Sequence, residues 1–147
     1  MRRWIPLALF ATCLGLMALC RWTALAGRLL HRPETYFGLI PVVLGLSIGI
    51  VGLWQLRRAG TTVKAFDRPG RLVTNGIYRY TRNPIYLGLA LMLIGACVLF
   101  SARCAMVPVA VFVLLADRWF IRVEERMLSA EFGSEFEQYR VRTRRWL

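Results

Sequence analysis

The sequence predicts an all-α integral membrane protein with about four transmembrane helices, a long cytoplasmic loop and a short amphipathic helix near the C-terminus. Two observations carry this prediction. The chain of 147 residues is 57% hydrophobic and yet has a formal net charge of +12, and its apolar residues gather in four long runs. Soluble domains rarely combine these properties, whereas multi-span membrane proteins with basic loops do. A nucleic-acid-binding domain would also be basic, but it would not carry long apolar runs.

The apolar runs are expected to cross the membrane within a single domain of residues 1–147, at residues 4–25, 36–56, 84–100 and 105–121. Each is about long enough for a hydrocarbon core of roughly 30 Å. The fourth run is the weakest because Asp117 and Arg118 interrupt it. The N-terminus has a second interpretation, since two arginines, an apolar run and Ala24-Leu25-Ala26 resemble a cleavable signal peptide. The length of the run and the position of Arg21-Trp22 favour a membrane span.

The distribution of basic residues predicts an orientation. The loop of residues 57–83 carries seven Arg or Lys against one Asp, and Arg2 and Arg3 precede the first run. The tail of residues 122–147 is also rich in Arg, whereas the two other connections are short and less basic. By the positive-inside rule, both termini and the 57–83 loop face the cytoplasm. Because Lys64 is the only lysine, a GC-rich bacterial genome is expected, and hence the bacterial inner membrane.

Glycines in the second apolar run provide a surface for close helix packing. Gly45 and Gly49 are four residues apart, with Gly38 and Gly52 nearby. Small residues allow helix backbones to approach closely in lipid, where apolar side chains gain little by leaving the hydrocarbon. This face is therefore expected to pack either against another helix of the same chain or against a second copy in a homodimer.

Turn and cap signals organise the loop before the third run. Asn75-Gly76 is a turn signal, and the residues around it would allow a small hairpin. Asn83 is a favourable N-cap and Pro84 a favourable first helical residue. A helix is therefore expected to begin at this point.

The tail after the fourth run is expected to form two helical pieces. The first continues the run into the cytoplasm and ends at Gly133. The second begins at Ser134, which has capping-box spacing to Glu137. Three aromatic residues are expected to lie on the membrane surface, where nearby arginines meet lipid phosphates: Phe136, Tyr139 and Trp146.

Basic and aromatic residues alternate where the chain enters the third run. Arg79 and Arg82 stand there with Tyr78, Tyr80 and Tyr86 between and after them. Arginines bind carboxylates or phosphates through paired hydrogen bonds, and tyrosine rings stack on bases or face cations. Both residue types are also common at membrane interfaces without any catalytic role, so the pattern leaves two interpretations.

Two adjacent acids, Glu124 and Glu125, stand at the cytoplasmic end of the fourth run. Asp117 lies about two turns earlier, on the face of Glu124. Acids near a bilayer are costly unless they are paired or hydrated, so a partner is expected. That partner is either an arginine of the same helix, Arg118 or Arg122, or a group elsewhere in a functional site. The four cysteines show no metal-ligand spacing, so no metal site is expected.

Together these pieces form one ordered series: Gly76-x-Tyr78, Arg82-Asn83-Pro84-x-Tyr86-x-Gly88, Glu124-Glu125, Phe132-Gly133 and Tyr139. The series resembles the isoprenylcysteine carboxyl methyltransferase family and the related phospholipid methyltransferases, whose pattern is RHPxYxG followed by a Glu-Glu pair. The match covers roughly residues 63–139, over half of the chain. Each piece alone is weak, but the ordered series is fairly specific. The helical hairpin between its halves would bring Asn83 and Glu124 to the same side of the membrane.

The resemblance implies a membrane methyltransferase that uses S-adenosylmethionine. It implies a cofactor site formed by Gly76, Tyr78, Arg82, Asn83, Pro84, Tyr86, Leu87, Gly88, Glu124 and Glu125. Within this set, Arg82, Asn83 and Glu125 are the catalytic candidates, and Arg82 is suited to the cofactor carboxylate. Asn83 stands where the eukaryotic-type motif has His, and Asn cannot shuttle a proton. This departure bears on the methyl acceptor more than on the cofactor.

The chemistry implied is an in-line displacement, for which positioning supplies most of the catalysis when the acceptor is already a thiolate or carboxylate. An amine acceptor would need a base, and Glu125 is the candidate. The expected partners are a lipophilic or small-molecule methyl acceptor and membrane lipids, and not nucleic acid. Two other functions stay open. One is a nicotinamide-dependent membrane reductase, since sterol reductases look similar at their C-terminal ends, and the other is a non-catalytic membrane protein that keeps the fold.

Overall fold

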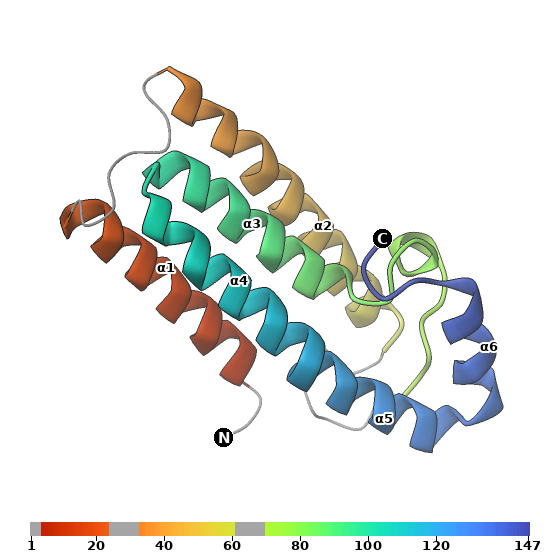
Figure 1. Cartoon of the computed structure of the whole chain (residues 1–147). Helices are drawn as coiled ribbons and strands as arrows, with labels where there is room; N and C mark the ends of the chain where they lie inside the picture. Colours follow the sequence, from red (N-terminus) through yellow and green to blue (C-terminus); the bar gives the residue numbers. More distant parts are fainter. Residues whose placement is uncertain (1–3, 24–32, 61–69) are drawn as a thin grey trace.

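The computed structural model describes residues 4–23, 33–60 and 70–147, and all regular elements in these ranges are helical (Figure 1). The longer helices are α1 (Ile5–Thr23), α2 (Leu39–Arg58), α3 (Pro84–Phe100), α4 (Met106–Leu115), α5 (Ile121–Phe132) and α6 (Ser134–Arg142). Four short turns of helix connect or interrupt them: η2 (Glu34–Gly38), η3 (Gly76–Arg79), η4 (Arg103–Ala105) and η5 (Ala116–Phe120). The predicted hairpin around Asn75-Gly76 is wrong, because Gly76 begins η3.

The apolar helices agree with the predicted all-α membrane fold. Three described stretches are long and apolar enough to cross a membrane: Ile5–Thr23, Glu34–Arg58 and Arg103–Phe132. The third predicted span, residues 84–100, corresponds to α3, which is apolar over 17 residues and is therefore shorter than the other three. The predicted boundary of the loop at residue 57 is too early, since α2 continues through Arg58. Residues 24–25 of the first run and residues 61–69 of the loop lie outside the described ranges.

Asp117 and Arg118 interrupt the last membrane stretch, as predicted, but they do not end it. They lie in η5, a single π-helical turn between α4 and α5, so that the helical stretch continues to Phe132. Such π-turns are rare and often occur at functional sites.

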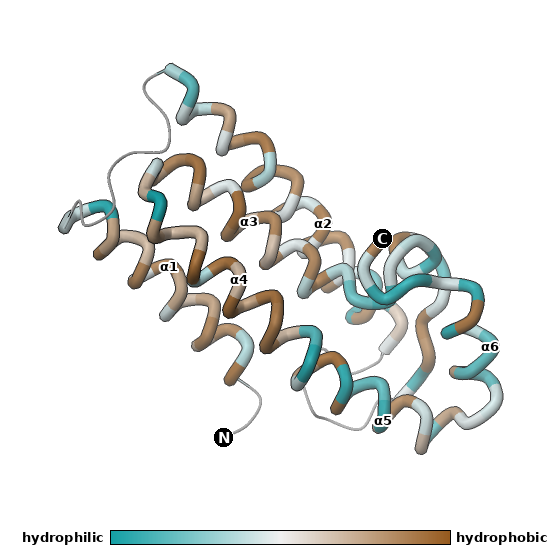
Figure 2. The backbone as a smooth tube through the Cα atoms, in the orientation of Figure 1, coloured by the Kyte–Doolittle hydropathy of each residue, from teal (hydrophilic) through white to brown (hydrophobic). Residues whose placement is uncertain are grey.

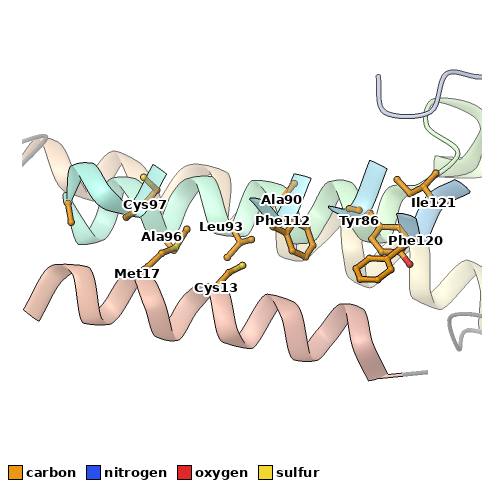
Figure 3. Close-up of a cluster of buried hydrophobic side chains, with 13 residues drawn as sticks. Cys13, Met17, Tyr86, Ala90, Leu93, Ala96, Cys97, Phe112, Phe120 and Ile121 are labelled. Carbon is orange, nitrogen blue, oxygen red and sulfur yellow. The ribbon is translucent and has the colours of Figure 1, made fainter. Parts of the chain in front are cut away.

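The buried core lies between α1, α3 and α4 (Figure 3). Cys13 and Met17 of α1 face Leu93 of α3, and these three side chains are at most 2% exposed. Phe10 of α1 packs edge-to-face on Phe112 of α4, with ring centroids 6.3 Å apart. In lipid such contacts stabilise through packing and dispersion rather than through removal of apolar surface from water.

Glycines allow α2 and α3 to approach at backbone distance. A Cβ atom built on Gly45 would lie 2.4 Å from the carbonyl oxygen of Gly88, and one built on Gly95 would lie 2.5 Å from the carbonyl oxygen of Gly38. Side chains at these positions would force the helices apart. The predicted glycine face therefore packs within the chain, while a Cβ on Gly49 would meet nothing within 4 Å. A homodimer stays a prediction.

Polar residues gather at one end of the bundle, where η5, α5, α6, the 70–83 segment and the C-terminus meet (Figure 2). Gly133, at φ +51°, ends α5 as predicted. The capping box is wrong, because Gly133 is the cap of α6 and Ser134 is already helical. The membrane-surface prediction is wrong for Phe136 and Tyr139, which are 1% and 8% exposed because they pack inward.

Candidate active site

The C-terminal segment lies beside the loop that precedes α3. The backbone N–H of Arg82 donates to the carbonyl oxygen of Arg144 at 3.0 Å. The Thr81 hydroxyl donates to the carbonyl of Arg145 at 3.3 Å, and the Thr143 hydroxyl donates to that of Arg79 at 3.4 Å. Residues 62 to 64 positions apart in sequence are thereby brought together.

Asn83 occupies the predicted N-cap position of α3, but its side chain does not cap the helix. Its Nδ2 atom donates to the carbonyl oxygen of Arg145 at 3.0 Å instead. Its backbone N–H donates to Oγ1 of Thr81 at 3.2 Å. The cap expected from the local sequence is therefore replaced by a tertiary bond to the partly buried tail carbonyl. Pro84 is the first helical residue, as predicted.

Glu125 of α5 is held between two arginines. Nη2 of Arg82 lies 3.1 Å from Oε1 of Glu125, and these side chains are only 10% and 14% exposed. Arg145 approaches the same carboxylate with two nitrogens, Nε at 3.2 Å and Nη2 at 2.5 Å. Paired charged hydrogen bonds of this kind fix geometry as well as charge. The intrahelical pairing proposed for Glu125 is thus wrong, because its partners come from outside α5.

Glu124 points to α3. Its Oε1 atom accepts a 2.8 Å hydrogen bond from the hydroxyl of Tyr86. The Tyr86 ring is stacked with that of Phe120, at a centroid distance of 6.4 Å. Among the described residues, no basic side chain lies within ion-pair distance of Glu124. The segment Arg82-Asn83-Pro84 (the RNP segment) was predicted to meet the Glu-Glu pair across the helical hairpin, and this is confirmed. Glu124 is bound by Tyr86, and Glu125 by Arg82.

Asp117 in the π-turn completes a network that sequence reasoning did not assign to the site. Its Oδ1 atom accepts from Nη1 of Arg145 at 3.2 Å and from the indole nitrogen of Trp146 at 3.0 Å. Trp146 was expected on the membrane surface, and the arginines near the C-terminus at lipid phosphates. The only sequence signal for Arg145 and Trp146 is that a basic and an aromatic residue stand together after the last helix. This signal could not identify a site, because such pairs are also common at membrane interfaces.

Burial and charge act in opposite directions on the two arginines. Burial lowers the pKa of the Arg82 guanidinium, and the neighbouring Glu125 partly offsets this effect. The hydrogen bond to Glu125 raises the pKa of Arg145. Burial raises the pKa values of Tyr78 and Tyr139. The phenols of this site therefore stay neutral near pH 7, and the arginines stay charged.

Arg82 retains unused hydrogen-bonding capacity. Its Nε and Nη1 atoms are buried and have no acceptor within the described part of the chain. Only Nη2 is engaged, by Glu125. A buried guanidinium donor without a partner costs free energy. An anionic group placed beside Arg82 would remove this cost, so the site has the chemistry of a carboxylate or phosphate receptor.

The remaining predicted site residues form the support between this centre and α2. Gly76 has φ +58°, and a Cβ there would meet the side chain of Gln55. The carbonyl of Tyr78 accepts a 2.7 Å bond from the Tyr139 hydroxyl. Three others are buried in α3: Pro84, Leu87 and Gly88. Pro84 contacts Gly52, and Gly88 faces Gly45. Direct cofactor contacts at these positions stay predictions.

Comparison with known proteins places this arrangement among methyltransferases. Residues 33–135 match the family model described as phospholipid methyltransferase. A probable protein-S-isoprenylcysteine O-methyltransferase of Oryza sativa subsp. indica is 31% identical over 110 residues, which are 71% of this chain and 56% of that protein. Protein-S-isoprenylcysteine O-methyltransferase A of Arabidopsis thaliana is 31% identical over 114 residues, 74% of this chain and 56% of its own.

The corresponding protein of Schizosaccharomyces pombe, protein-S-isoprenylcysteine O-methyltransferase, is 38% identical over 108 residues, 64% of this chain and 44% of its own. The chain thus spans about half the length of the curated relatives it matches. No solved structure matches it.

Proposed function

Because the chain belongs to the phospholipid methyltransferase family, we propose that it is a membrane methyltransferase that uses S-adenosylmethionine. The methyl group passes to a lipophilic or small acceptor that carries a carboxylate, thiol or amine. When bound, the cofactor supplies a methyl group on a positively charged sulfur, which the acceptor takes by in-line displacement.

Arg82 is the observation that carries this proposal. It is buried at the cytoplasmic start of α3 in the proposed orientation, and two of its three side-chain nitrogens have no acceptor among the described residues. The cofactor contains a carboxylate, the group that an arginine binds best. Asn83 and Glu125 hold Arg82 in place from either side, through the tail and through the 3.1 Å ion pair.

The acids and phenols of the site fit the rest of the cofactor. Glu124 accepts one bond from Tyr86 and retains capacity for a ribose hydroxyl or an ammonium group. Tyr86 and Phe120 supply an aromatic surface beside it. The side chains of Arg82 and Glu125 are only 10% and 14% exposed, so positioning in a partly desolvated site is the main contribution of this chain to catalysis.

The acceptor is proposed from the relatives. Three relatives are named protein-S-isoprenylcysteine O-methyltransferases, and their names imply a carboxylate of a lipid-modified cysteine as the acceptor. A carboxylate needs no base, which suits Asn83, since its amide cannot accept a proton at neutral pH. For an amine acceptor, Glu125 would take the proton, although two arginines occupy it.

The proposed location is the bacterial inner membrane, with both termini in the cytoplasm. The start of α1 and the C-terminus lie toward the same end of the bundle (Figure 1). The end of α2, the 70–83 segment and α6, all rich in arginine, lie at that end too, as the positive-inside rule requires of a cytoplasmic face. Reporter fusions at each end of the chain test this orientation: cytoplasmic reporters active at both ends support it, and a periplasmic signal at either end contradicts it.

The function is tested by calorimetric titration of the detergent-purified protein with S-adenosylmethionine and, separately, with NADPH. Binding of the first alone is expected. Arg82→Ala should weaken binding at least tenfold, the scale of a lost charged hydrogen bond. Arg79→Ala is the matched control, because Arg79 is exposed on η3 three residues away. Binding of NADPH instead would favour a reductase, and binding of neither would remove both enzyme functions.

A further inference from the structure

We propose that the C-terminal segment Thr143–Trp146 is part of the cofactor site and that Arg145 is its positioning residue. This inference rests on the proposed function. It assigns to Arg145 the task of holding Glu125 and Asp117 so that Arg82 stays free to bind an anionic group of the ligand. Arg145 itself touches no ligand.

The backbone of the segment is fixed by bonds that only a docked tail provides. Carbonyl oxygens of Arg144 and Arg145 accept from Arg82, Thr81 and Asn83, at 3.0 to 3.3 Å. Thr143 is 6% exposed and donates to the carbonyl of Arg79. Thr143, Arg144 and Arg145 therefore lie beside residues 79–83, which include the motif residues Arg82 and Asn83.

The side chain of Arg145 connects two acids of the Arg103–Phe132 stretch, Asp117 and Glu125. It uses Nε and Nη2 for Glu125 and Nη1 for Asp117, so that its full set of nitrogens is occupied. Trp146 adds a second donor to Asp117 at 3.0 Å. The π-turn at Ala116–Phe120 places Asp117 in this network. A helical irregularity and a docked tail thus meet at one carboxylate.

The charge balance explains why Arg145 matters to Arg82. Two arginines face Glu125, and Asp117 is paired with Arg145. Without Arg145, Glu125 would have Arg82 as its one remaining partner in the described chain. Asp117 would keep only the exposed Arg118, whose Nε lies 3.9 Å from its Oδ2 atom. Arg82 would then turn toward the acids, and the added net negative charge would repel an incoming carboxylate.

The same argument predicts different behaviour for a lysine at this position. Lys keeps the charge, and so keeps the repulsion low, but it cannot hold two carboxylates in a fixed geometry. A role in ligand positioning should therefore be partly rescued by Arg145→Lys. If the tail has only a structural role, the affinity of the variants should instead fall in parallel with their melting temperature.

The experiment compares titration of S-adenosylmethionine and thermal melting for the full-length protein and four variants: Arg145→Ala, Arg145→Lys, Asp117→Asn and Arg142→Ala. Arg142 is an exposed arginine at the end of α6 and serves as the matched control. Arg145→Ala should weaken affinity about tenfold, the scale of one lost charged hydrogen bond. Arg145→Lys should recover a part of that loss, and Asp117→Asn should weaken affinity less than Arg145→Ala.

Each outcome decides between the two proposals. If the unmodified protein binds S-adenosylmethionine and Arg145→Ala binds it equally well, the role of Arg145 is overturned and the proposed function stands. If affinity falls only in proportion to melting temperature, with no recovery by Lys, the tail is structural and the inference is also overturned. If the unmodified protein binds no S-adenosylmethionine, the proposed function fails first, and the inference fails with it.

Discussion

The hydroxyl of Tyr86 donates a 2.8 Å hydrogen bond to Oε1 of Glu124 and so joins the first turn of α3 to α5, 38 residues later. Next to it, Arg82, which lies two residues before the start of α3, pairs with Glu125 of α5. Adjacent acids on one helix are thereby given different partners, one neutral and one charged. The family motif and the Glu-Glu pair become one site through these two contacts.

Replacing Tyr86 by Phe should destabilise the protein by about 1–2 kcal/mol, since it leaves a carboxylate oxygen of Glu124 without its donor while the ring remains. Tyr80→Phe is the matched control, because Tyr80 is 73% exposed. The free energy of unfolding is measured by titration with denaturing detergent from mixed micelles. Equal effects of the two substitutions would contradict a stabilising role of the Tyr86 bond.

Replacing Asn83 by Ala should loosen the C-terminal tail without ending α3, because the Asn83 side chain bonds to the tail and not to the helix. The backbone amide of Arg82, which donates to Arg144, should exchange with solvent deuterium about fivefold faster, as the loss of about 1 kcal/mol implies. Asn75→Ala removes an exposed asparagine without a capping bond and should leave this rate unchanged. Unaltered exchange of the Arg82 amide in Asn83→Ala would show that the tail docks without Asn83.

Gly76 should tolerate alanine less well than Gly60 does. Both have positive φ, +58° and +68°, so each alanine should cost about 1–2 kcal/mol of backbone strain. At Gly76 the new Cβ also displaces Gln55, whose Oε1 accepts from the N–H of Ile77 at 3.1 Å, whereas Gly60 has open space. The unfolding free energy should fall further for Gly76→Ala, by about another 1 kcal/mol. A larger loss for Gly60→Ala would argue against the contact with Gln55.

Alanine at Gly45 should separate α2 from α3. Its Cβ would lie 2.4 Å from a backbone oxygen, which cannot move as a side chain can, so a loss of about 1–3 kcal/mol is expected. Gly49→Ala lies one turn away in open space and should be neutral or slightly stabilising, because Ala favours the helix. Melting temperatures in detergent compare the two. If Gly49→Ala were the more harmful variant, the face would pack against a second copy rather than against α3.

The apolar runs and the motif series were accessible to sequence reasoning for a physical reason. A run such as Pro84–Phe100 can be predicted as a helix without knowledge of its neighbours, since in lipid the backbone must satisfy its own hydrogen bonds. The helix starts and stops at Pro84 and Gly133 follow from local backbone preferences, and both were predicted. The pairing of the RNP segment with the Glu-Glu pair followed from a hairpin of two short-linked helices.

Other features depend on contacts that no local pattern encodes. Asn83 has the sequence of a cap, yet a tail carbonyl 62 positions later takes its side chain. Phe136 and Tyr139 have the pattern of a membrane-surface helix, yet both are buried, and the Tyr139 hydroxyl donates to the carbonyl oxygen of Tyr78. Arg145 is one of several similar arginines in the tail until folding places it between Glu125 and Asp117.

The sequence by itself therefore determined the apolar helices, the start of α3 at Pro84, the end of α5 at Gly133 and the membrane class of this protein, because solvent, lipid and backbone geometry act on neighbouring residues. Only the tertiary structure decided which arginine holds which acid and which glycines allow which helices to approach. Those choices depend on distances between segments far apart in the chain, and they fix the free energy of each buried charge.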